Sequence, residues 1–411
     1  MFAIYNTAIA IASFFLKLVA FLSPKIRLFV DGRKDTFSVL EAHFSDTDDV
    51  LWVHTASLGE FEQGLPLIER LGETYPSHKI LVTFFSPSGF EVKKNTPVAH
   101  LTTYLPLDTK KNARKFIGLV KPKLALFVKY EIWPNYLKVL EQQEVPTLLV
   151  SAIFKKEQPY FKWYGGFMRN ALRRFSHIFV QDKNSQQLLK AIDLDKVTVS
   201  GDTRFDRVSE ILDRTNSLDF MERFKGAHFC MVAGSTWPED EAILTAYINA
   251  SEQDFKYVLA PHDIKPDHIK RLTMALDKKT LLYSEMDRYD LANFEVLVLD
   301  TIGLLTKVYS YADLAYVGGA FATGLHNTLE PAVFGIPVVI GPQYQGFREA
   351  EDLVAKKGIH VIRDLGEFSR LMTQFIAHPE FLKKTGEINR SYVAENRGAS
   401  VQIIGHIRTL L

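Results

Sequence analysis

Two series of alternating strand and helix patterns limit what this chain can fold into more than any other feature of its sequence. Short apolar and β-branched runs recur between longer stretches of helical periodicity, over residues 50–200 and again over 229–377. This alternation is typical of βαβ units, in which helices cover both faces of a parallel sheet. A single hydrophobic core seldom exceeds about 250–300 residues, so we expect a chain of 411 residues to form two α/β domains.

The patterns also predict where each element lies. In the first series we expect strands at 50–54, 79–85, 101–105, 124–130, 147–152, 177–181 and 197–200, with helices at 61–75, 110–119, 135–143, 160–174 and 185–192. In the second we expect strands at 229–233, 257–260, 280–283, 295–299, 314–317, 337–340 and 360–362, with helices at 239–250, 264–276, 328–334, 347–357 and 367–377. The domains expected from this division are an apolar N-terminal helix (1–30), a first domain (31–205), a linker (206–225), a second domain (226–390) and a C-terminal helix (391–411).

Charge and cysteine content exclude several classes of protein. The single cysteine, Cys230, rules out an internal disulfide framework and a cysteine-based metal site. The formal net charge of +1 lacks the basic field that nucleic-acid binding requires. Residues 109–174, however, hold 14 basic and 4 acidic side chains, a net charge of +10. This window predicts either an anionic partner or a set of solvated helix faces.

The N-terminal segment 2–22 carries a membrane signal. Its only polar residues are Asn6, Thr7, Ser13 and Lys17, and basic residues follow it. The length is close to the ~20 residues that a spanning helix needs, and the basic flank predicts a cytoplasmic C-terminal side. A cleaved signal peptide fits less well, because no basic residue precedes the apolar run. We expect a membrane anchor or interfacial helix, with a helix packed on a core as the alternative, and leave open whether it spans.

Polar residues follow three predicted strands of the first domain. They are Ser57, Gly59 and Glu60, then Ser86 and Ser88, then Glu131. Glu60 could act as a general base, although Ser57-x-x-Glu60 also has the spacing of a capping box. Ser86 and Ser88 could bind an anion or cap a helix, and Glu131 could bind sugar hydroxyls or pair with a lysine.

The second domain shows a comparable set. Gly234, Ser235 and Thr236 follow its first strand and suit a phosphate, although Thr236-x-x-Glu239 could be a capping box. A glycine-rich turn at 318–331 contains Gly324, His326, Asn327 and Glu330, and we expect a helix to start near Asn327 with amides that favour an anion. Neither stretch matches a P-loop or a Rossmann glycine fingerprint. The 12 histidines show no zinc-site spacing, so no metal site is expected.

In order and spacing, these motifs resemble one family, the 3-deoxy-D-manno-octulosonic acid (Kdo) transferases of lipopolysaccharide assembly. The resemblance runs from the N-terminal helix to about residue 355. It rests on the segments 54–60, 104–108, 131–135, 201–206, 233–236, 300–303, 318–331 and 341–342.

The resemblance implies a GT-B fold, with two doubly wound Rossmann-like domains facing a cleft and a C-terminal helix packed back on the first domain. It implies metal-independent, inverting transfer of Kdo from CMP-Kdo to the phosphorylated lipid A precursor (lipid IVA), at the cytoplasmic face of the inner membrane. Glu60 would be the general base. Gly234, Ser235, Thr236, His262, Gly324, His326, Asn327 and Glu330 would bind CMP, with His262 replacing an arginine of the family. Ser57, Gly59, Ser86, Ser88, Glu131 and Arg204 would line the acceptor side.

Two other hypotheses remain open at this stage. The glycine-rich turn with Glu330 also suits a UDP-sugar transferase or a nucleotide-sugar epimerase of the same fold. A non-catalytic membrane-associated binding module is the weaker alternative, because polar residues recur at the strand ends of both sheets. No cofactor and no nucleic acid are expected, and the sequence does not predict an oligomeric state.

Overall fold

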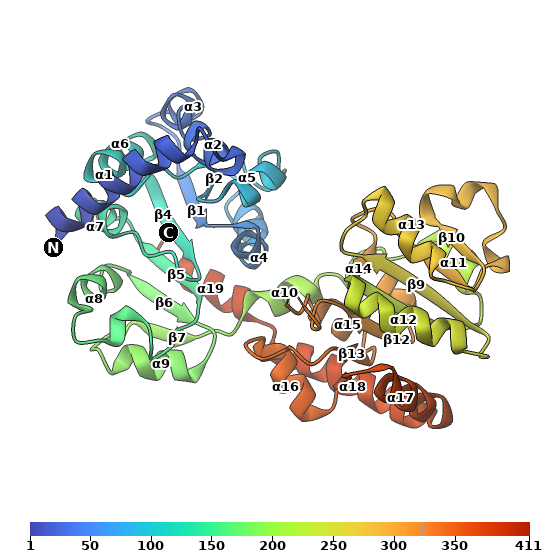
Figure 1. The fold of residues 1–411 in the computed structure, drawn as a ribbon. Helices are drawn as coiled ribbons and strands as arrows, with labels where there is room; N and C mark the ends of the chain where they lie inside the picture. Colours follow the sequence, from blue (N-terminus) through green and yellow to red (C-terminus); the bar gives the residue numbers. More distant parts are fainter. Residues whose placement is uncertain (323) are drawn as a thin grey trace. The chain divides into compact units, whose positions relative to one another are not determined.

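The computed structural model describes residues 1–322 and 324–411, which form two compact units. Unit 1 comprises Met1–Arg207 and Arg397–Leu411, and unit 2 comprises Val208–Asn396. The chain therefore passes from unit 1 into unit 2 and back (Figure 1). The first crossing falls within the stretch expected as a linker.

Unit 1 contains a parallel sheet of seven strands within the described residues, in the order β3-β2-β1-β4-β5-β6-β7. This order reverses direction beside β1, as in doubly wound folds, so the loops after β1 and β4 flank a topological switch point. The strands are Val50–Thr55 (β1), Lys79–Phe84 (β2), Leu101–Tyr104 (β3), Pro122–Val128 (β4), Thr147–Ala152 (β5), His177–Val180 (β6) and Val197–Val199 (β7).

Helices cover both faces of this sheet because successive side chains of a buried strand point to opposite sides. Trp52 packs in one core with residues of α3, α6, α7, α8 and α9, whereas Leu51 and Val53 pack with α4 and α19 on the other face. The helices are Thr36–His43 (α3), Leu58–Thr74 (α4), Pro87–Lys93 (α5), Lys110–Val120 (α6), Pro134–Gln142 (α7), Pro159–Phe161 (η1), Gly166–Leu172 (α8), Lys183–Lys190 (α9), Thr203–Ser209 (α10) and Ala399–Ile407 (α19).

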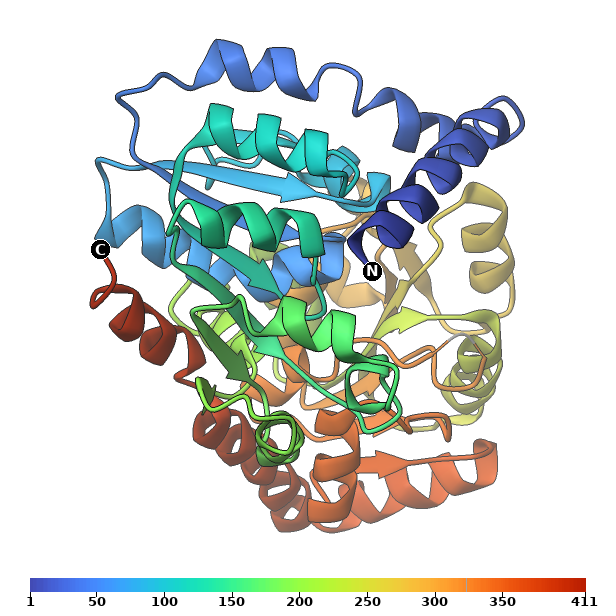
Figure 2. The ribbon, with the colours of Figure 1, turned by 90° about the vertical axis from the view of Figure 1, so that its left-hand side faces the viewer.

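The N-terminal segment forms two helices, α1 (Phe2–Val19) and α2 (Pro24–Asp31), that meet at a corner. Arg27 donates to the carbonyl of Ala20 at this corner. Among the described residues, α1 is the one helix long and apolar enough to cross a bilayer, and none of its length is buried. Figure 2 shows α1 lying along the surface of unit 1.

Unit 2 repeats the architecture with a different strand order, β10-β11-β9-β8-β12-β13-β14, all parallel. Helices α12, α13 and α17 pack on one face of this sheet. The strands are Phe229–Thr236 (β8), Phe255–Pro261 (β9), Thr280–Leu282 (β10), Val296–Val298 (β11), Leu314–Val317 (β12), Val338–Ile340 (β13) and Ile359–Val361 (β14). The helices are Asp219–Lys225 (α11), Pro238–Ala250 (α12), Pro266–Met274 (α13), Tyr283–Arg288 (η2), Leu291–Asn293 (η3), Leu305–Val308 (α14), Tyr309–Tyr311 (η4), Leu329–Val333 (α15), Arg348–Lys356 (α16), Leu365–Ala377 (α17) and Pro379–Asn396 (α18).

The predicted α/β class with two doubly wound sheets is confirmed, and all fourteen expected strands lie within a few residues of observed ones. The helix predicted at 160–174 is confirmed only in its second half, as α8, and its predicted start is wrong. A 3-10 turn and a loop precede α8 there, because Gly165 lies so close to Pro159 that an added Cβ would meet the Pro159 carbonyl oxygen at 1.9 Å. The stretch expected as a linker contains α11, with Phe220, Met221 and Phe224 buried, and α18 was not predicted as a separate helix.

Candidate functional site

The predicted site residues of unit 1 all follow strands of its sheet. Ser57, Gly59 and Glu60 come after β1, Ser86 and Ser88 after β2, Glu131 after β4, and Arg204 after β7. Because the strands are parallel, these residues share the carboxyl edge of the sheet. This is the edge at which doubly wound folds bind their ligands.

The Glu60 carboxylate is not used for a capping box. Ser57 precedes α4 at the N-cap position, yet its side chain accepts no backbone hydrogen bond. Instead, the Ser57 hydroxyl donates to Oε2 of Glu60. The alternative that both side chains serve only to cap α4 is therefore wrong. Ser57 holds a carboxylate at the carboxyl end of β1, where it could accept a proton.

Other polar groups surround Glu60. Burial raises the pKa of Tyr130, and the charges of Glu60 and Asp202 raise it further, which places both carboxylates near the Tyr130 phenol. Asp202 is 6% exposed and pairs with Arg204 at 2.9 Å. Gln63, on α4, also donates to Asp202. Arg204 is thus held by a buried carboxylate beside the region that contains Glu60.

Glu131 lies at the end of a chain of hydrogen bonds that starts inside the sheet. The Trp52 indole donates to Oγ1 of Thr83 at 2.8 Å, and Thr83 lies 2.8 Å from Nδ1 of His54. His54 Nε2 lies 3.2 Å from Oε2 of Glu131. The carboxylate requires a donor at Nε2, so neutral His54 carries its proton there and accepts from Thr83 at Nδ1.

A second indole completes the orientation of Glu131. Trp133 donates to the same Oε2 atom at 2.8 Å, so both donors hold one oxygen of the carboxylate. The Glu131 side chain is 13% exposed. Two residues earlier, Lys129 has a φ of +70°, a conformation that non-glycine residues seldom adopt outside functional or tightly constrained sites. The alternative that Glu131 only pairs with a lysine is wrong, because its partners are His54 and Trp133.

Arg33 joins the N-terminal helices to the loop that contains Ser86. Its guanidinium donates to the carbonyls of Phe29, Phe85 and Leu105, and its carbon lies 3.7 Å from the centre of the Phe29 ring. Burial lowers the pKa of Arg33 to about 10. In the loop itself, Ser86 caps α5 through the backbone N–H of Ser88. Both serines therefore lie beside the attachment point of α2.

In unit 2, one buried carboxylate joins the loops after β8 and β12. Asp240 is 0% exposed and accepts from the Tyr316 hydroxyl at 2.7 Å and from the backbone N–H groups of Trp237 and Gly319 at 2.9 Å each. The neighbouring Gly318 permits this approach, because an added Cβ would meet the Ser235 carbonyl oxygen at 2.5 Å. Thr236 bonds to Glu241 instead of capping α12, so the capping-box alternative for Thr236 and Glu239 is also wrong.

Three aromatic side chains cluster at this edge. The Trp237 indole donates to Nε2 of His326 at 3.1 Å. The His262 ring lies over both, at 4.6 Å from Trp237 and 4.7 Å from His326. Burial lowers the pKa of His326, and His262 lowers it further, whereas Asp240 opposes the shift. His326 is therefore held neutral, with Nε2 as an acceptor.

The glycine-rich turn leads into α15, as expected, but the first amide of this helix is occupied. Asn327 accepts from the backbone N–H of Leu329 at 3.1 Å and donates to Glu330 at 3.0 Å. Thr306 also donates to Glu330, at 2.8 Å. Gly324 has a φ of +114°, which favours glycine, and Thr323 lies outside the described residues. The expected free amides at Asn327 are thus partly used by Asn327 itself.

The structure therefore groups the predicted residues into two sets, one at the carboxyl edge of each sheet. Sequence reasoning missed His54, Trp133, Trp237 and Asp240 as members of these sets. His54 and Trp133 flank motifs that were recognised, so their proximity to predicted site residues was the available signal. Asp240 gave no signal beyond an acidic residue in the first turn of a helix. Among the described residues, no group of three His, Cys, Asp or Glu side chains is arranged to hold a metal.

Comparison with known proteins shows which enzymes this chain resembles. The family model described as 3-deoxy-D-manno-octulosonic-acid transferase (kdotransferase) matches residues 32–207. The 3-deoxy-D-manno-octulosonic acid transferase of Haemophilus influenzae is 27% identical over 88% of this chain and 87% of its own length. That of Aquifex aeolicus is 28% identical over 88% of this chain and 98% of its own length. The chain is therefore similar to Kdo transferases over most of its length.

The similarity to these transferases indicates a glycosyltransferase of lipopolysaccharide biosynthesis. Solved structures agree on the fold. A UDP-GlcNAc 2-epimerase from Neisseria meningitidis aligns with a TM-score of 0.63 over 88% of this chain and 100% of its own, at 16% identity. MurG of Acinetobacter baumannii aligns with a TM-score of 0.55 over 88% of this chain and 99% of its own, at 12% identity. These likenesses confirm the predicted GT-B fold.

Proposed function

We propose that this protein is a Kdo transferase, which moves Kdo from CMP-Kdo to a hydroxyl of the phosphorylated lipid A precursor, with inversion and without a metal. The observation that carries the proposal is the Glu60 carboxylate, held by the Ser57 hydroxyl and not consumed by helix capping. Similarity to Kdo transferases supports the transferred sugar and the pathway. Glu131, oriented through one oxygen by His54 and Trp133, is the second carboxylate of this edge.

In the proposed reaction, Glu60 removes the proton of the acceptor hydroxyl. The hydroxyl oxygen forms a bond to the anomeric carbon of Kdo, and the bond from that carbon to the phosphate oxygen of CMP breaks. The electron pair of the broken bond leaves with CMP. A positioned carboxylate base contributes about 10²–10⁴-fold to such a step. Glu131, with a fixed carboxylate orientation, would hold hydroxyls of the sugar or the acceptor.

Unit 2 would bind CMP through Gly234, Ser235, Thr236, His262, Gly324, His326, Asn327 and Glu330. Ser235 has a φ of +55°, which turns the backbone sharply at the end of β8. A Cβ added at Gly234 would lie 2.0 Å from the hydroxyl of Tyr309. The end of β8 therefore requires a residue without a side chain at this position. Backbone N–H groups and imidazoles suit the phosphate of a leaving nucleotide better than carboxylates do.

The decisive experiment compares wild type with Glu60→Gln, using CMP-Kdo and lipid IVA and reading the product by mass spectrometry. We expect the variant to lose about 10²–10⁴-fold in kcat while retaining CMP affinity. Glu62→Gln is the matched control, because Glu62 lies on the same helix and forms surface ion pairs with Lys93 and Arg207. Normal turnover by Glu60→Gln would overturn the base assignment. Tight binding of UDP but not CMP would instead favour a UDP-sugar enzyme.

We further propose that α1 lies in the plane of the inner-membrane interface, on the cytoplasmic face, and does not span the bilayer. Its first turns are attached to unit 1, since Tyr5 donates to Asp108 at 2.8 Å and Asn6 accepts from Asn135 at 3.1 Å. Its other end is attached to the same unit through α2 and Arg33. A helix whose two ends are held by one folded unit has both ends on one side of the membrane.

The side chains of α1 fit this arrangement. Large apolar residues are exposed along one stripe of the helix, at Ile4, Ile11, Phe14, Phe15 and Leu18. Their spacing along the helix places these side chains on one face of α1. Phe2 and Asn6 lie on the opposite face, where they contact Phe167 and Asn135 of the same unit. Glutamate at Phe14 and Phe15 should release the protein from vesicles of phosphatidylethanolamine and phosphatidylglycerol, because both side chains would otherwise enter the interface. Continued binding would overturn the in-plane assignment.

A further inference from the structure

The turn between η1 and α8 presents two aromatic side chains to solvent. Trp163 is 92% exposed, more than any other large apolar side chain in the described part of the chain, and Tyr164 is 55% exposed. Their rings contact each other edge to face at 5.6 Å. Aromatic residues of this size are normally buried, so their exposure at neighbouring positions indicates a surface that contacts something.

The turn has a defined structure. Arg169 donates to the carbonyls of Tyr160 and Lys162, at 3.0 and 2.8 Å, which fixes the chain on one side of Trp163. Gly165 fixes it on the other, where only hydrogen in place of Cβ fits against Pro159. Tyr160 also packs on the buried Phe154 ring at 5.8 Å. Trp163 is therefore held at the tip of a braced turn.

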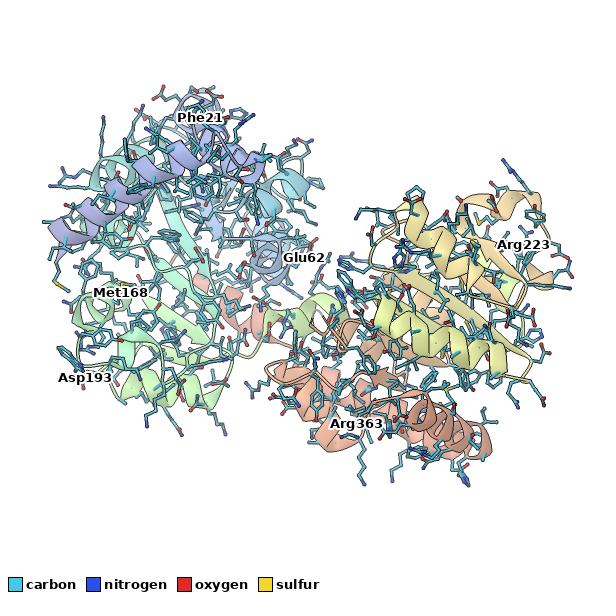
Figure 3. The ribbon with its side chains drawn as sticks, viewed as in Figure 1. Phe21, Glu62, Met168, Asp193, Arg223 and Arg363 are labelled. Atoms are coloured by element: carbon cyan, nitrogen blue, oxygen red, sulfur yellow. The ribbon has the colours of Figure 1, made fainter. Side chains whose placement is uncertain are left out.

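The turn continues into the part of unit 1 on which α1 rests. Phe167, one residue into α8, contacts the Phe2 ring at 5.0 Å and the Tyr5 ring at 5.4 Å. Figure 3, in which Met168 of α8 is labelled, shows α8 beside the N-terminal end of α1 within unit 1. The exposed aromatic tip thus lies only a few residues from the docked end of α1.

The charge around the tip favours an anionic surface. Lys155, Lys156 and Lys162 lie in the segment that precedes Trp163, and none of them forms an ion pair within the described residues. Glu157 is the single acidic residue between positions 151 and 165. Lysines beside tryptophan and tyrosine are typical of segments at the water interface of an anionic leaflet.

We propose that Trp163 and Tyr164 form a second membrane anchor, which inserts into the interface of an anionic bilayer beside α1. This rests on the proposed in-plane position of α1. Two points of attachment along one side of unit 1 would prevent it from rotating about the axis of α1. The acceptor edge of the sheet would then keep one orientation toward the lipid surface from which its substrate comes.

The test measures binding of the full chain to vesicles of phosphatidylethanolamine and phosphatidylglycerol by flotation. We expect Trp163→Ala with Tyr164→Ala to lower the partition coefficient about tenfold, the loss typical of one large apolar side chain withdrawn from an apolar medium. Tyr289→Ala, which removes a 50% exposed tyrosine of unit 2, is the matched control and should bind as wild type does. Neutral phosphatidylcholine vesicles should bind wild type more weakly.

A spectroscopic arm uses lipids brominated in the acyl chain, which quench tryptophan in the interface. Wild type should be quenched, and Trp163→Phe should lose that quenching while binding within about twofold, because phenylalanine is also apolar. Unchanged flotation of the double alanine variant, with the α1 variant released, would overturn the second anchor and leave the in-plane α1 intact. A change of oligomeric state by the alanine variant without a change in flotation would also overturn it, in favour of a protein interface. Full binding by both the double alanine variant and the α1 variant would overturn the second anchor and the proposed membrane role of α1 together.

Discussion

The two units share an architecture but build the carboxyl edges of their sheets from different chemistry. In unit 1 the edge presents carboxylates whose orientation is fixed by side chains, as Glu60 is by Ser57 and Glu131 by His54 and Trp133. In unit 2 the main carboxylate, Asp240, is fully buried and faces inward to hold the loops together. The imidazoles of His262 and His326 are only partly covered at that edge. One fold therefore carries two carboxyl edges of different chemistry, and our proposal assigns proton acceptance to the first and anion binding to the second.

We expect the largest effect when the charge of Glu131, the carboxylate oriented by His54 and Trp133 in unit 1, is removed. Glu131→Gln should lower kcat about 10²–10³-fold, because the amide loses the charge that His54 and Trp133 hold in place. CMP affinity should not change, since CMP is assigned to unit 2. The measurement is steady-state kinetics with CMP-Kdo alongside calorimetric titration of CMP.

His54→Gln distinguishes orientation of Glu131 from simple structural support. Glutamine can still donate to Glu131, so we expect a smaller loss in kcat, about tenfold, with an altered pH profile and an unchanged melting temperature. An equal loss of activity and stability would show that the bond only supports the fold.

A further test removes Asp240, the buried carboxylate of unit 2. Asp240→Ala leaves the Tyr316 hydroxyl and the amides of Trp237 and Gly319 without their acceptor, so unit 2 should lose about 3 kcal/mol of unfolding free energy. Hydrogen exchange should increase in β8 and β12 and remain unchanged in β1 and β4. Asp254→Ala, at an 86% exposed side chain of the same unit, is the control. Normal CMP binding by a folded Asp240→Ala variant would show that the loops which Asp240 joins, after β8 and β12, are not needed for CMP binding.

The smallest expected effect is a pH dependence of CMP binding at the carboxyl edge of the unit 2 sheet. Neutral His326 accepts from Trp237, and burial lowers its pKa below the ordinary 6.5. The stabilisation from the neutral ring is therefore complete above pH 6.5 and is lost as the pH falls through the lowered pKa. As the pH falls, protonation of the CMP phosphate, whose second pKa is about 6, will itself change CMP affinity. We expect protonation of His326 to weaken CMP affinity by an additional two- to threefold.

His326→Gln separates the two titrations. The glutamine carbonyl can accept from Trp237 at every pH, so only the phosphate contribution should remain in calorimetric titrations with CMP. Identical pH profiles for wild type and this variant would show that His326 does not contribute.

The fold was largely predictable from the sequence because apolar periodicity reports directly on burial. Every expected strand is present, and the polar residues that follow strands do lie at the carboxyl edges. Hydrogen-bond partners were less predictable. Ser57 and Glu60 have the spacing of a capping box, yet the serine bonds to the carboxylate itself. Spacing along a helix cannot distinguish these geometries, since both use the same residues.

Contacts that helical periodicity does not report account for the other failures. The helix predicted at 160–174 matches local propensity, but the approach of Gly165 to Pro159 and the bonds from Arg169 to two carbonyls impose a turn. Asp240 lies 76 residues from Tyr316 in the chain, so no local sequence pattern predicts the hydrogen bond between them. The attachment of α1 to unit 1 also depends on a distant contact, between Tyr5 and Asp108.

The return of the chain to unit 1 has a consequence for the order of folding. Helix α19 supplies Ile403, Ile404 and Ile407 to the core on one face of the first sheet, and Asp206 accepts from the amides of Gly398 and Ser400 at 2.6 and 2.8 Å. These residues leave the ribosome after all of unit 2. Until then, the nascent chain carries an uncovered apolar face on unit 1. Completion of unit 1 must wait for α19, and an exposed apolar face during this interval favours aggregation unless chaperones cover it.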